Sequence, residues 1–140
     1  MKPVLFDANV VLDVLLDRAP HVAASAAAWA IVESRGAKGL LAAHAVTTIH
    51  YLIRKETGAA KAKNILMAML TVFEVAPVDG DVIADALELP LADFEDAVTA
   101  AAARRSNCEL IITRDPRGFR GALVRPLSPE AALPILSAPR

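Results

Sequence analysis

The chain alternates short apolar runs with longer segments of helical spacing, and this alternation constrains its fold more than any other feature. Residues 4–6, 40–43, 72–75 and 109–113 are mainly apolar and too short for helices, which predicts strands. A weaker strand is expected near residues 123–124. Because strands that alternate with helices form parallel sheets covered on both faces, we predict a three-layer α/β/α fold with a central, mostly parallel sheet.

Helical spacing is clearest directly after the first apolar run. One face there is apolar and the other acidic, formed by Val10, Val11, Val14 and Leu15 against Asp13 and Asp17. Further helices are predicted over residues 20–35, 44–56, 59–71, 79–89, 93–103 and 128–136. Glycine and proline stand where several of them should stop, at Gly36, Gly58 and Pro90.

Length and composition indicate one globular domain over residues 1–140. The chain is 55% hydrophobic but only 4% aromatic, so the core should consist of Ala, Val, Leu and Ile. Charges interrupt the apolar N-terminal run, and the single cysteine, Cys108, cannot form an internal disulfide. We therefore expect a cytoplasmic protein without membrane contact. A net charge of −1 means that nucleic acid would have to bind through a local basic patch.

Three aspartates stand where a parallel α/β sheet collects its ligands, beyond the carboxyl ends of the strands. Asp7 follows the first strand, Asp115 follows the strand at 109–113, and Asp96 lies near the start of the helix before that strand. Clustered carboxylates repel one another unless a cation or proton neutralises them. Mg²⁺ prefers oxygen ligands and stabilises charge on a phosphodiester during its displacement. The pattern therefore points to hydrolysis of a nucleic-acid backbone.

Each acidic residue also has a purely structural interpretation, and the residues alone leave both open. Asp7 can cap the helix that follows it, and Asn9 is more typical of a cap or turn than of a ligand. Asp93, Glu95 and Asp96 open a helix, where acidic side chains favour the positive end of the dipole. Asp115 precedes Pro116 in the polar turn at 114–118 and is a common turn former.

In combination the motifs are more specific. The segments VLFDANVVLDVLLDR, LADFEDAVTAAAA and LIITRDPRGF resemble, in order and spacing, the acidic blocks of PIN domains, the nuclease fold of bacterial VapC-type toxins. The most specific parts are Asp-x-Asn after the first strand, Asp-Phe-Glu-Asp at a helix start, and Thr-Arg-Asp after the last core strand. The resemblance spans nearly the whole chain.

This resemblance implies roles for individual residues. It assigns the catalytic metal ligands to Asp7, Asp96 and Asp115, with Asp93 one helical turn before Asp96 as a further ligand. Asn9 and Thr113 fall where polar residues commonly support the site. It further implies Mg²⁺- or Mn²⁺-dependent endoribonuclease activity, a small antitoxin partner and a homodimer.

One position departs from the family pattern. PIN domains usually carry a glutamate on the helix after the second strand, and Thr48 stands there in this chain. Tyr51 and Lys55 share the helix face of Thr48. A hydroxyl at this position can still hold a water molecule, and Asp93 is the expected substitute ligand.

The remaining polar candidates carry less information. His44 and His50 are six residues apart and do not form a metal-binding pair on one helix face, so we interpret them as solvent-facing or capping. Cys108 is interpreted as an inert, small apolar residue. Arginines flank Asp96 and Asp115 in sequence and could hold RNA phosphates, with Arg114 and Arg117 foremost, then Arg104, Arg105 and Arg120.

Three functions follow from the sequence. The leading one is a single-strand-selective endoribonuclease that acts as the toxin of a toxin–antitoxin pair. The second, motivated by Thr48, is a degenerate PIN domain that binds RNA or a protein partner without cleavage. The third is a Mg²⁺-dependent phosphatase or phosphotransferase with Asp7 as nucleophile, but such enzymes commonly need a second aspartate where this chain has Asn9.

Overall fold

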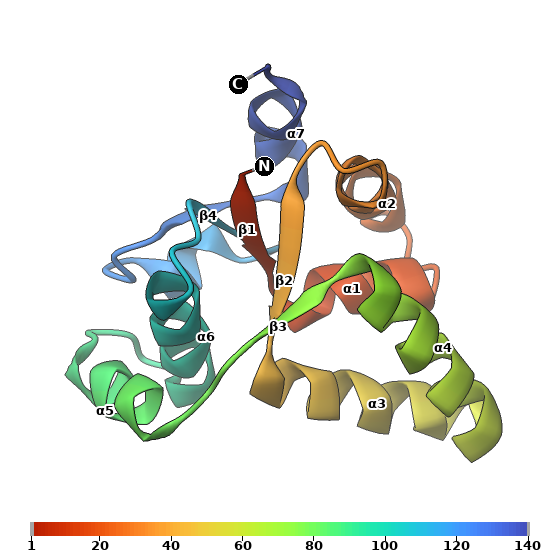
Figure 1. Cartoon of the computed structure of the whole chain (residues 1–140), viewed down its shortest axis with the longest axis horizontal. Helices are drawn as coiled ribbons and strands as arrows, with labels where there is room; N and C mark the ends of the chain where they lie inside the picture. The colour runs from red at the N-terminus through yellow and green to blue at the C-terminus, as the bar shows by residue number, and fades with distance from the viewer. Residues whose placement is uncertain (1, 140) are drawn as a thin grey trace.

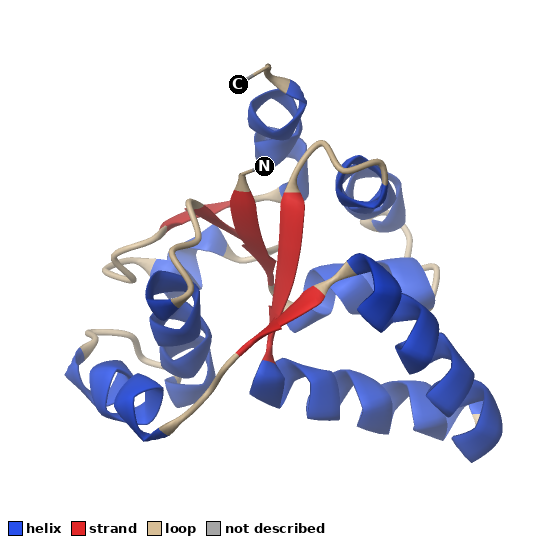
Figure 2. Cartoon of the chain, viewed as in Figure 1, coloured by secondary structure: helices blue, strands red, loops and turns tan. Residues whose placement is uncertain are grey.

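The computed structural model describes residues 2–139 and contains a five-stranded sheet in the order β3-β2-β1-β4-β5. Every neighbouring pair of strands is parallel. Figure 2 shows the strands gathered at the centre of the molecule with helices around them. The strands are β1 (Pro3–Phe6), β2 (Lys38–Ala42), β3 (Glu74–Ala76), β4 (Leu110–Ile112) and β5 (Arg125–Leu127).

Helices cover both faces of this sheet, as the sequence predicts. In Figure 1, α5 and α6 lie to the left of the strands, whereas α1, α2 and α4 lie to the right. The helices are α1 (Ala8–Leu15), α2 (Val22–Glu33), α3 (Ala43–Thr57), α4 (Ala59–Val72), α5 (Gly80–Glu88), α6 (Phe94–Arg105) and α7 (Pro129–Ser137), with a 3-10 turn η1 (Pro116–Phe119). None of the helices within residues 2–139 is both long and apolar enough to cross a membrane.

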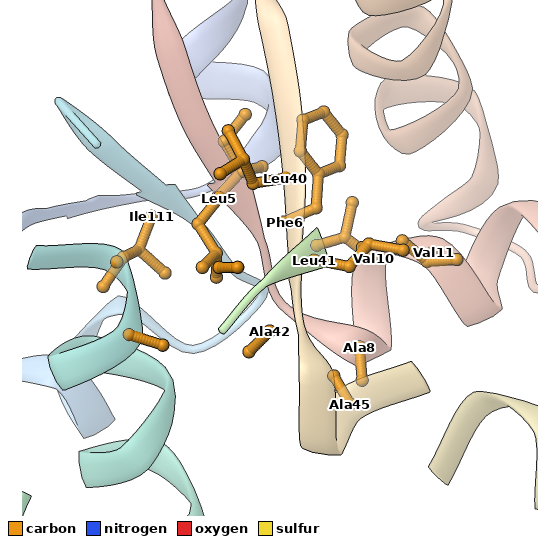
Figure 3. Close-up of a cluster of buried hydrophobic side chains, with 14 of the residues drawn as sticks. Leu5, Phe6, Ala8, Val10, Val11, Leu40, Leu41, Ala42, Ala45 and Ile111 are labelled. Atoms are coloured by element: carbon orange, nitrogen blue, oxygen red, sulfur yellow. The ribbon is translucent and has the colours of Figure 1, made fainter. Parts of the chain in front are cut away.

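The core forms on both faces of the central strand β1. Because successive side chains of a strand alternate, Leu5 and Ile111 point toward α6 and Phe6 points to the opposite side (Figure 3). On that opposite side Phe6 and Trp29 both make edge contacts with Phe73, at centroid distances of 5.0 and 4.9 Å. Trp29 thus contributes to the core. Residues 97–103 of α6 are all buried, and its five alanines there let this helix pack closely on the sheet.

Short polar side chains begin four of the helices, at or near the starts that the sequence predicts. The side chains of Asp7, Asp79, Asp93 and Ser128 accept hydrogen bonds from backbone N–H groups in the first turns of α1, α5, α6 and α7. Such caps satisfy donors that the helix itself leaves unpaired. Two of these caps, Asp7 and Asp93, belong to the predicted site.

Two strands are displaced from their predicted positions. The run at 72–75 was expected to be a strand, but Val72 ends α4 and the strand is Glu74–Ala76. The apolar signal of Val72 belongs to the helix. The last strand, expected near residues 123–124, is Arg125–Leu127, because Leu123 has a positive φ of 66° and cannot continue a strand. Pro126 is tolerated there because β5 lies at the edge of the sheet.

The acidic face predicted for the first helix is wrong at Asp13. This side chain is fully buried, and its Oδ2 lies 2.8 Å from Nε of Arg114. Arg18 lies farther away, 3.8 Å from Oδ1 of Asp13. The periodic pattern missed this pair because its partner lies about a hundred residues away in sequence.

Candidate active site

Asp7 stands at the carboxyl end of the central strand and begins α1. Its backbone N–H donates to the carbonyl of Ile112 at 2.9 Å, which continues the hydrogen bonding between β1 and β4 by one residue. Its Oδ1 accepts the N–H of Ala8 at 2.9 Å. Asp7 therefore caps α1, which is the structural interpretation that the sequence leaves open. The same hydrogen bond fixes its carboxylate at the edge of the sheet.

Thr113 connects Asp7 to the loop that carries Asp115. The buried Thr113 hydroxyl donates to Oδ2 of Asp7 at 2.9 Å and accepts the backbone N–H of Asp115 at 3.1 Å. The Thr113 side chain thus orients the carboxylate of Asp7 and fixes the backbone of Asp115. The supporting role that the resemblance implies for Thr113 stays a prediction.

Asp96 and Asp115 come together beside Gly118 of η1. A Cβ atom built on Gly118 would lie 2.9 Å from Oδ2 of Asp115 and 3.3 Å from Oδ2 of Asp96. Both carboxylates therefore face the volume that a side chain at this position would fill. Glycine keeps this volume free, which neither the turn motif nor the resemblance indicates.

The electrostatics of the cluster show that the acids are close enough to affect one another. The pKa of Asp96 is raised to about 6, first by burial and then by the negative charges of Asp7, Asp93 and Asp115. Burial also raises the pKa of Asp7, against the hydrogen bond from Thr113 that lowers it. These acids therefore favour a proton or a cation among them.

The residues fit a divalent cation. Carboxylate oxygens are the ligands that Mg²⁺ prefers, and Asp7, Asp96 and Asp115 supply them around one edge of the sheet. The free volume at Gly118 lies between two of the three side chains. Within residues 2–139 no three His, Cys, Asp or Glu side chains stand close enough together to hold a metal ion, so ion binding would require these carboxylates to move closer to one another.

Three further residues were predicted for the site, Asp93 as a ligand and Asn9 and Thr48 as supporting residues. Asp93 is exposed, and its Oδ1 accepts the backbone N–H of Asp96 at 3.0 Å as a helix cap. Asn9 is exposed on the first turn of α1, and Thr48 is half-buried on the second turn of α3. A direct role in ion binding for these three residues stays a prediction.

The interpretation of His44 as a solvent-facing or capping residue is wrong. Its side chain is half-buried, its Nε2 lies 3.2 Å from the Thr99 hydroxyl on α6, and α3 has no side-chain cap. Its charge is one of the influences that lower the pKa of Asp7. His44 lies two residues after the end of β2. A position just after a strand is the signal that selects Asp7 after β1, and the same signal would have selected His44. Thr99 gives no such signal in the sequence.

Glu95 is a further acid of the site that the sequence presents only as part of a helix start. It is exposed on the first turn of α6, and its charge raises the pKa of both Asp7 and Asp96. The Asp-Phe-Glu-Asp motif contains it, but periodicity cannot say which of its three acids face the sheet edge.

The arginines that flank the acids in sequence separate in space. Arg114 pairs with the buried Asp13, whereas Arg117 is exposed on η1, beside Gly118. Arg105 binds Asp85 at 2.6 and 3.2 Å at the far end of α6, where a cavity of about 560 Å³ opens between α5 and α6. Arg117 therefore lies on the 3-10 turn that brings Gly118 beside Asp96 and Asp115.

Cys108 lies outside this cluster. It is buried, and burial raises the pKa of its thiol to about 11, so the group stays uncharged. This agrees with its interpretation as an inert apolar residue.

The parallel sheet and the aspartate cluster at its carboxyl edge define an α/β/α domain with an acidic candidate site. The sequence matches the PIN domain family over residues 3–117, and the chain belongs to that family. A sequence search of curated proteins finds no match.

Solved structures with the same fold include one described as a toxin and one described as a toxin–antitoxin complex. VapBC2 from Rickettsia felis, bound to a promoter DNA fragment, superposes with a TM-score of 0.71 at 11% identity, over 90% of this chain and 98% of the other. FitAcB from Neisseria gonorrhoeae gives 0.67 at 23% identity, over 91% and 98%. The sarcin-ricin loop cleaving toxin VapC20 of Mycobacterium tuberculosis gives 0.62 at 17% identity, over 77% and 86%. At these identities the likeness shows the fold.

Proposed function

We propose that this chain is a Mg²⁺- or Mn²⁺-dependent endoribonuclease of the PIN type and acts in the cytoplasm as the toxin of a toxin–antitoxin pair. The observation that carries the proposal is the approach of Asp7 and Asp115 to Asp96, since their charges act with the burial of Asp96 to raise its pKa to about 6. Membership in the PIN family supports a nuclease, and the third hypothesis, an aspartyl-phosphate enzyme, has no such support.

In this proposal the three aspartates hold the ion, and Thr113 orients Asp7 through its 2.9 Å hydrogen bond. When bound, a divalent ion lowers the pKa of a coordinated water and stabilises negative charge on a phosphodiester. Arg117 binds a neighbouring phosphate of the RNA, and Arg114 contributes through the part of its guanidinium group that Asp13 leaves open.

RNA is proposed as the substrate on two grounds. The chain belongs to the PIN family, and one solved structure with this fold is described as a toxin that cleaves the sarcin-ricin loop. The exposed position of Arg117 beside the aspartates suits contact with a nucleic-acid backbone.

The test is cleavage of single-stranded and structured RNA by the purified chain, with and without Mg²⁺ or Mn²⁺. We expect cleavage that needs the ion and that falls by at least about a hundredfold in Asp7→Asn and Asp96→Asn, because each variant removes a charged ligand. Asp17→Asn, an exposed aspartate beyond the end of α1, is the matched control and should cleave normally. Unchanged cleavage in Asp7→Asn would reject the assignment.

The alternative is a degenerate PIN domain that binds RNA or a protein partner without cleavage. The observation that favours it is Thr48, half-buried where the family usually has a glutamate. The Thr48→Glu variant separates the two proposals. Increased cleavage by this variant favours a weakened enzyme, whereas tight RNA binding with no turnover in either form favours the binding domain.

We also propose a small antitoxin partner and a homodimer. One solved structure with this fold, from Klebsiella pneumoniae, is described as a toxin–antitoxin complex, which supports the antitoxin. Co-purification with the product of an adjacent small reading frame would test that partner. Sedimentation of the isolated chain tests the homodimer, and a monomer at all concentrations would remove it.

A further inference from the structure

The hydrogen bonds of Thr99 determine which nitrogen of His44 carries a proton. The Thr99 hydroxyl donates to the backbone carbonyl of Glu95 at 3.0 Å and lies 3.2 Å from Nε2 of His44. A hydroxyl has only one proton to donate. Because this proton goes to the carbonyl, Nε2 of His44 has to be the donor to Thr99. In the neutral ring Nδ1 then holds a free lone pair.

This lone pair is buried without a partner. Nδ1 of His44 is shielded from solvent and has no hydrogen-bond partner in the described part of the chain. An unpaired buried acceptor costs free energy, so its retention calls for an explanation. Asp7 follows β1 and His44 lies two residues after the neighbouring parallel strand β2, so both stand at the carboxyl edge of the sheet. The free nitrogen therefore belongs to the aspartate cluster.

A histidine that binds a metal has this arrangement. The neutral ring binds the ion through one nitrogen, while the other nitrogen donates its proton to a neighbouring oxygen and so fixes the ring. Here Thr99 is that oxygen, and its own bond to the Glu95 carbonyl fixes it in turn. The two hydrogen bonds that link Glu95, Thr99 and His44 thus connect the first turn of α6 to the first turn of α3.

We infer that Nδ1 of His44 is a ligand of the divalent ion held by Asp7, Asp96 and Asp115. The inference rests on the proposed function, and it deepens it by naming the kind of ion. His44 stands one helical turn before Thr48 and supplies a nitrogen on the helix where the family usually has a carboxylate oxygen. The site then has a mixed oxygen and nitrogen donor set.

A mixed donor set changes the preferred ion. Mg²⁺ is a hard cation that takes oxygen ligands, whereas imidazole nitrogen adds affinity for first-row transition ions. The site therefore binds Mn²⁺ more tightly than Mg²⁺, and His44 is the residue that produces the difference.

The test measures ion binding and needs no RNA. Mn²⁺ is titrated into the purified chain and followed by electron paramagnetic resonance, which reports both free Mn²⁺ and nitrogen coupled to bound Mn²⁺. We expect nitrogen coupling in the unmodified protein, with a coupling that changes on ¹⁵N labelling of histidine. In His44→Gln, whose amide can still reach Thr99, the coupling should vanish and the Mn²⁺ Kd should rise about tenfold or more. The Mg²⁺ Kd should change much less.

His50→Gln, on the same helix, is the matched control and should bind Mn²⁺ as the unmodified chain does. Mn²⁺ bound without nitrogen coupling, or with equal affinity in His44→Gln, would overturn the inference while the three-aspartate site and the nuclease stand. If Mn²⁺ binds neither the unmodified chain nor its variants, the proposed metal-dependent function fails as well. If His44→Gln does not fold, the presence or absence of nitrogen coupling in the unmodified protein tests the inference by itself.

Discussion

The hydroxyl of Thr113 donates a hydrogen bond of 2.9 Å to Oδ2 of Asp7, although the two residues are 106 positions apart in sequence. The same hydroxyl accepts the backbone N–H of Asp115. A single buried side chain therefore holds the first aspartate and the loop of the third in one arrangement. The candidate site depends on this connection between β1 and β4.

Replacing Thr113 with valine tests that connection. Thr113→Val keeps the shape of the side chain but leaves Oδ2 of Asp7 without its donor and the Asp115 N–H without its acceptor. Loss of such a supporting hydrogen bond typically costs 10–100-fold in metal affinity, and we expect Mn²⁺ binding to weaken by about that much. Thr113→Ser keeps the hydroxyl and should bind nearly as the unmodified chain does. Equal affinity in all three proteins would show that Thr113 only fills space.

Gly118 should be essential to the ion but not to the fold. The Cβ of Gly118→Ala would approach Oδ2 of Asp115 to 2.9 Å and displace it. We expect metal affinity to fall by roughly tenfold or more, since ligands must keep their positions closely. Gly80→Ala is the control, because its Cβ meets nothing within 4 Å. Calorimetric titration with Mn²⁺ measures both. A Gly118→Ala protein that binds Mn²⁺ normally would contradict the placement of the ion.

Ion binding should weaken in mild acid because protons compete with the ion. The pKa of Asp96 is about 6 in the folded chain, so below pH 6 its carboxylate is increasingly protonated. We expect Mn²⁺ affinity to fall by about tenfold per pH unit below 6, as for one competing proton. Calorimetry between pH 5 and 8 measures this dependence. An affinity that stays constant over that range would remove Asp96 from the ligands.

The same raised pKa lowers the stability of the metal-free chain at neutral pH. The folded state holds the Asp96 proton more tightly than the unfolded state, so this contribution to stability is fully present below pH 3.8 and is lost as the pH rises through about 6. Asp96→Asn should therefore raise the unfolding free energy at pH 7.5 by on the order of 1 kcal/mol, because partial exposure screens the charge. Denaturant unfolding without metal measures it. A destabilised Asp96→Asn would show that this carboxylate is structural.

Arg114 should contribute mainly to stability. It lies 2.8 Å from the fully buried Asp13, and Arg114→Ala would leave that carboxylate with only the distant Arg18. Breaking a buried pair from one side costs about 3–5 kcal/mol, so we expect a loss on that scale in urea unfolding. Arg117→Ala, from an exposed position, should leave stability unchanged and weaken RNA binding instead. Equal stability of the two variants would mean that Asp13 needs no partner.

Sequence patterns predict the fold well because they report local geometry. The apolar runs at 4–6, 40–43 and 109–113 and the helix starts near Asp79, Asp93 and Ser128 depend only on neighbouring residues, and these elements appear close to where they are expected. The strand near Leu123 is displaced because a positive φ at that residue leaves no periodic signal.

The site is only partly predictable for a related physical reason. Placement after strands selects Asp7 and Asp115, but contacts across the fold determine which other polar groups join them. The hydrogen bond between His44 and Thr99 joins residues that are 55 positions apart in sequence. Gly118 matters because it has no Cβ atom to approach the carboxylates of Asp115 and Asp96. Neither feature has a local pattern. Periodicity fails to predict the burial of Asp13 for the same reason, because its ion-pair partner Arg114 lies after a different strand, β4.

The most direct test of this account is the anomalous diffraction of crystals soaked with Mn²⁺. We predict one strong peak at the carboxyl edge of the sheet, with oxygens of Asp7, Asp96 and Asp115 among its ligands at roughly the 2.0–2.2 Å typical of divalent ions. A peak bound by other residues, or no peak at a Mn²⁺ concentration that supports cleavage, would contradict the three-aspartate site.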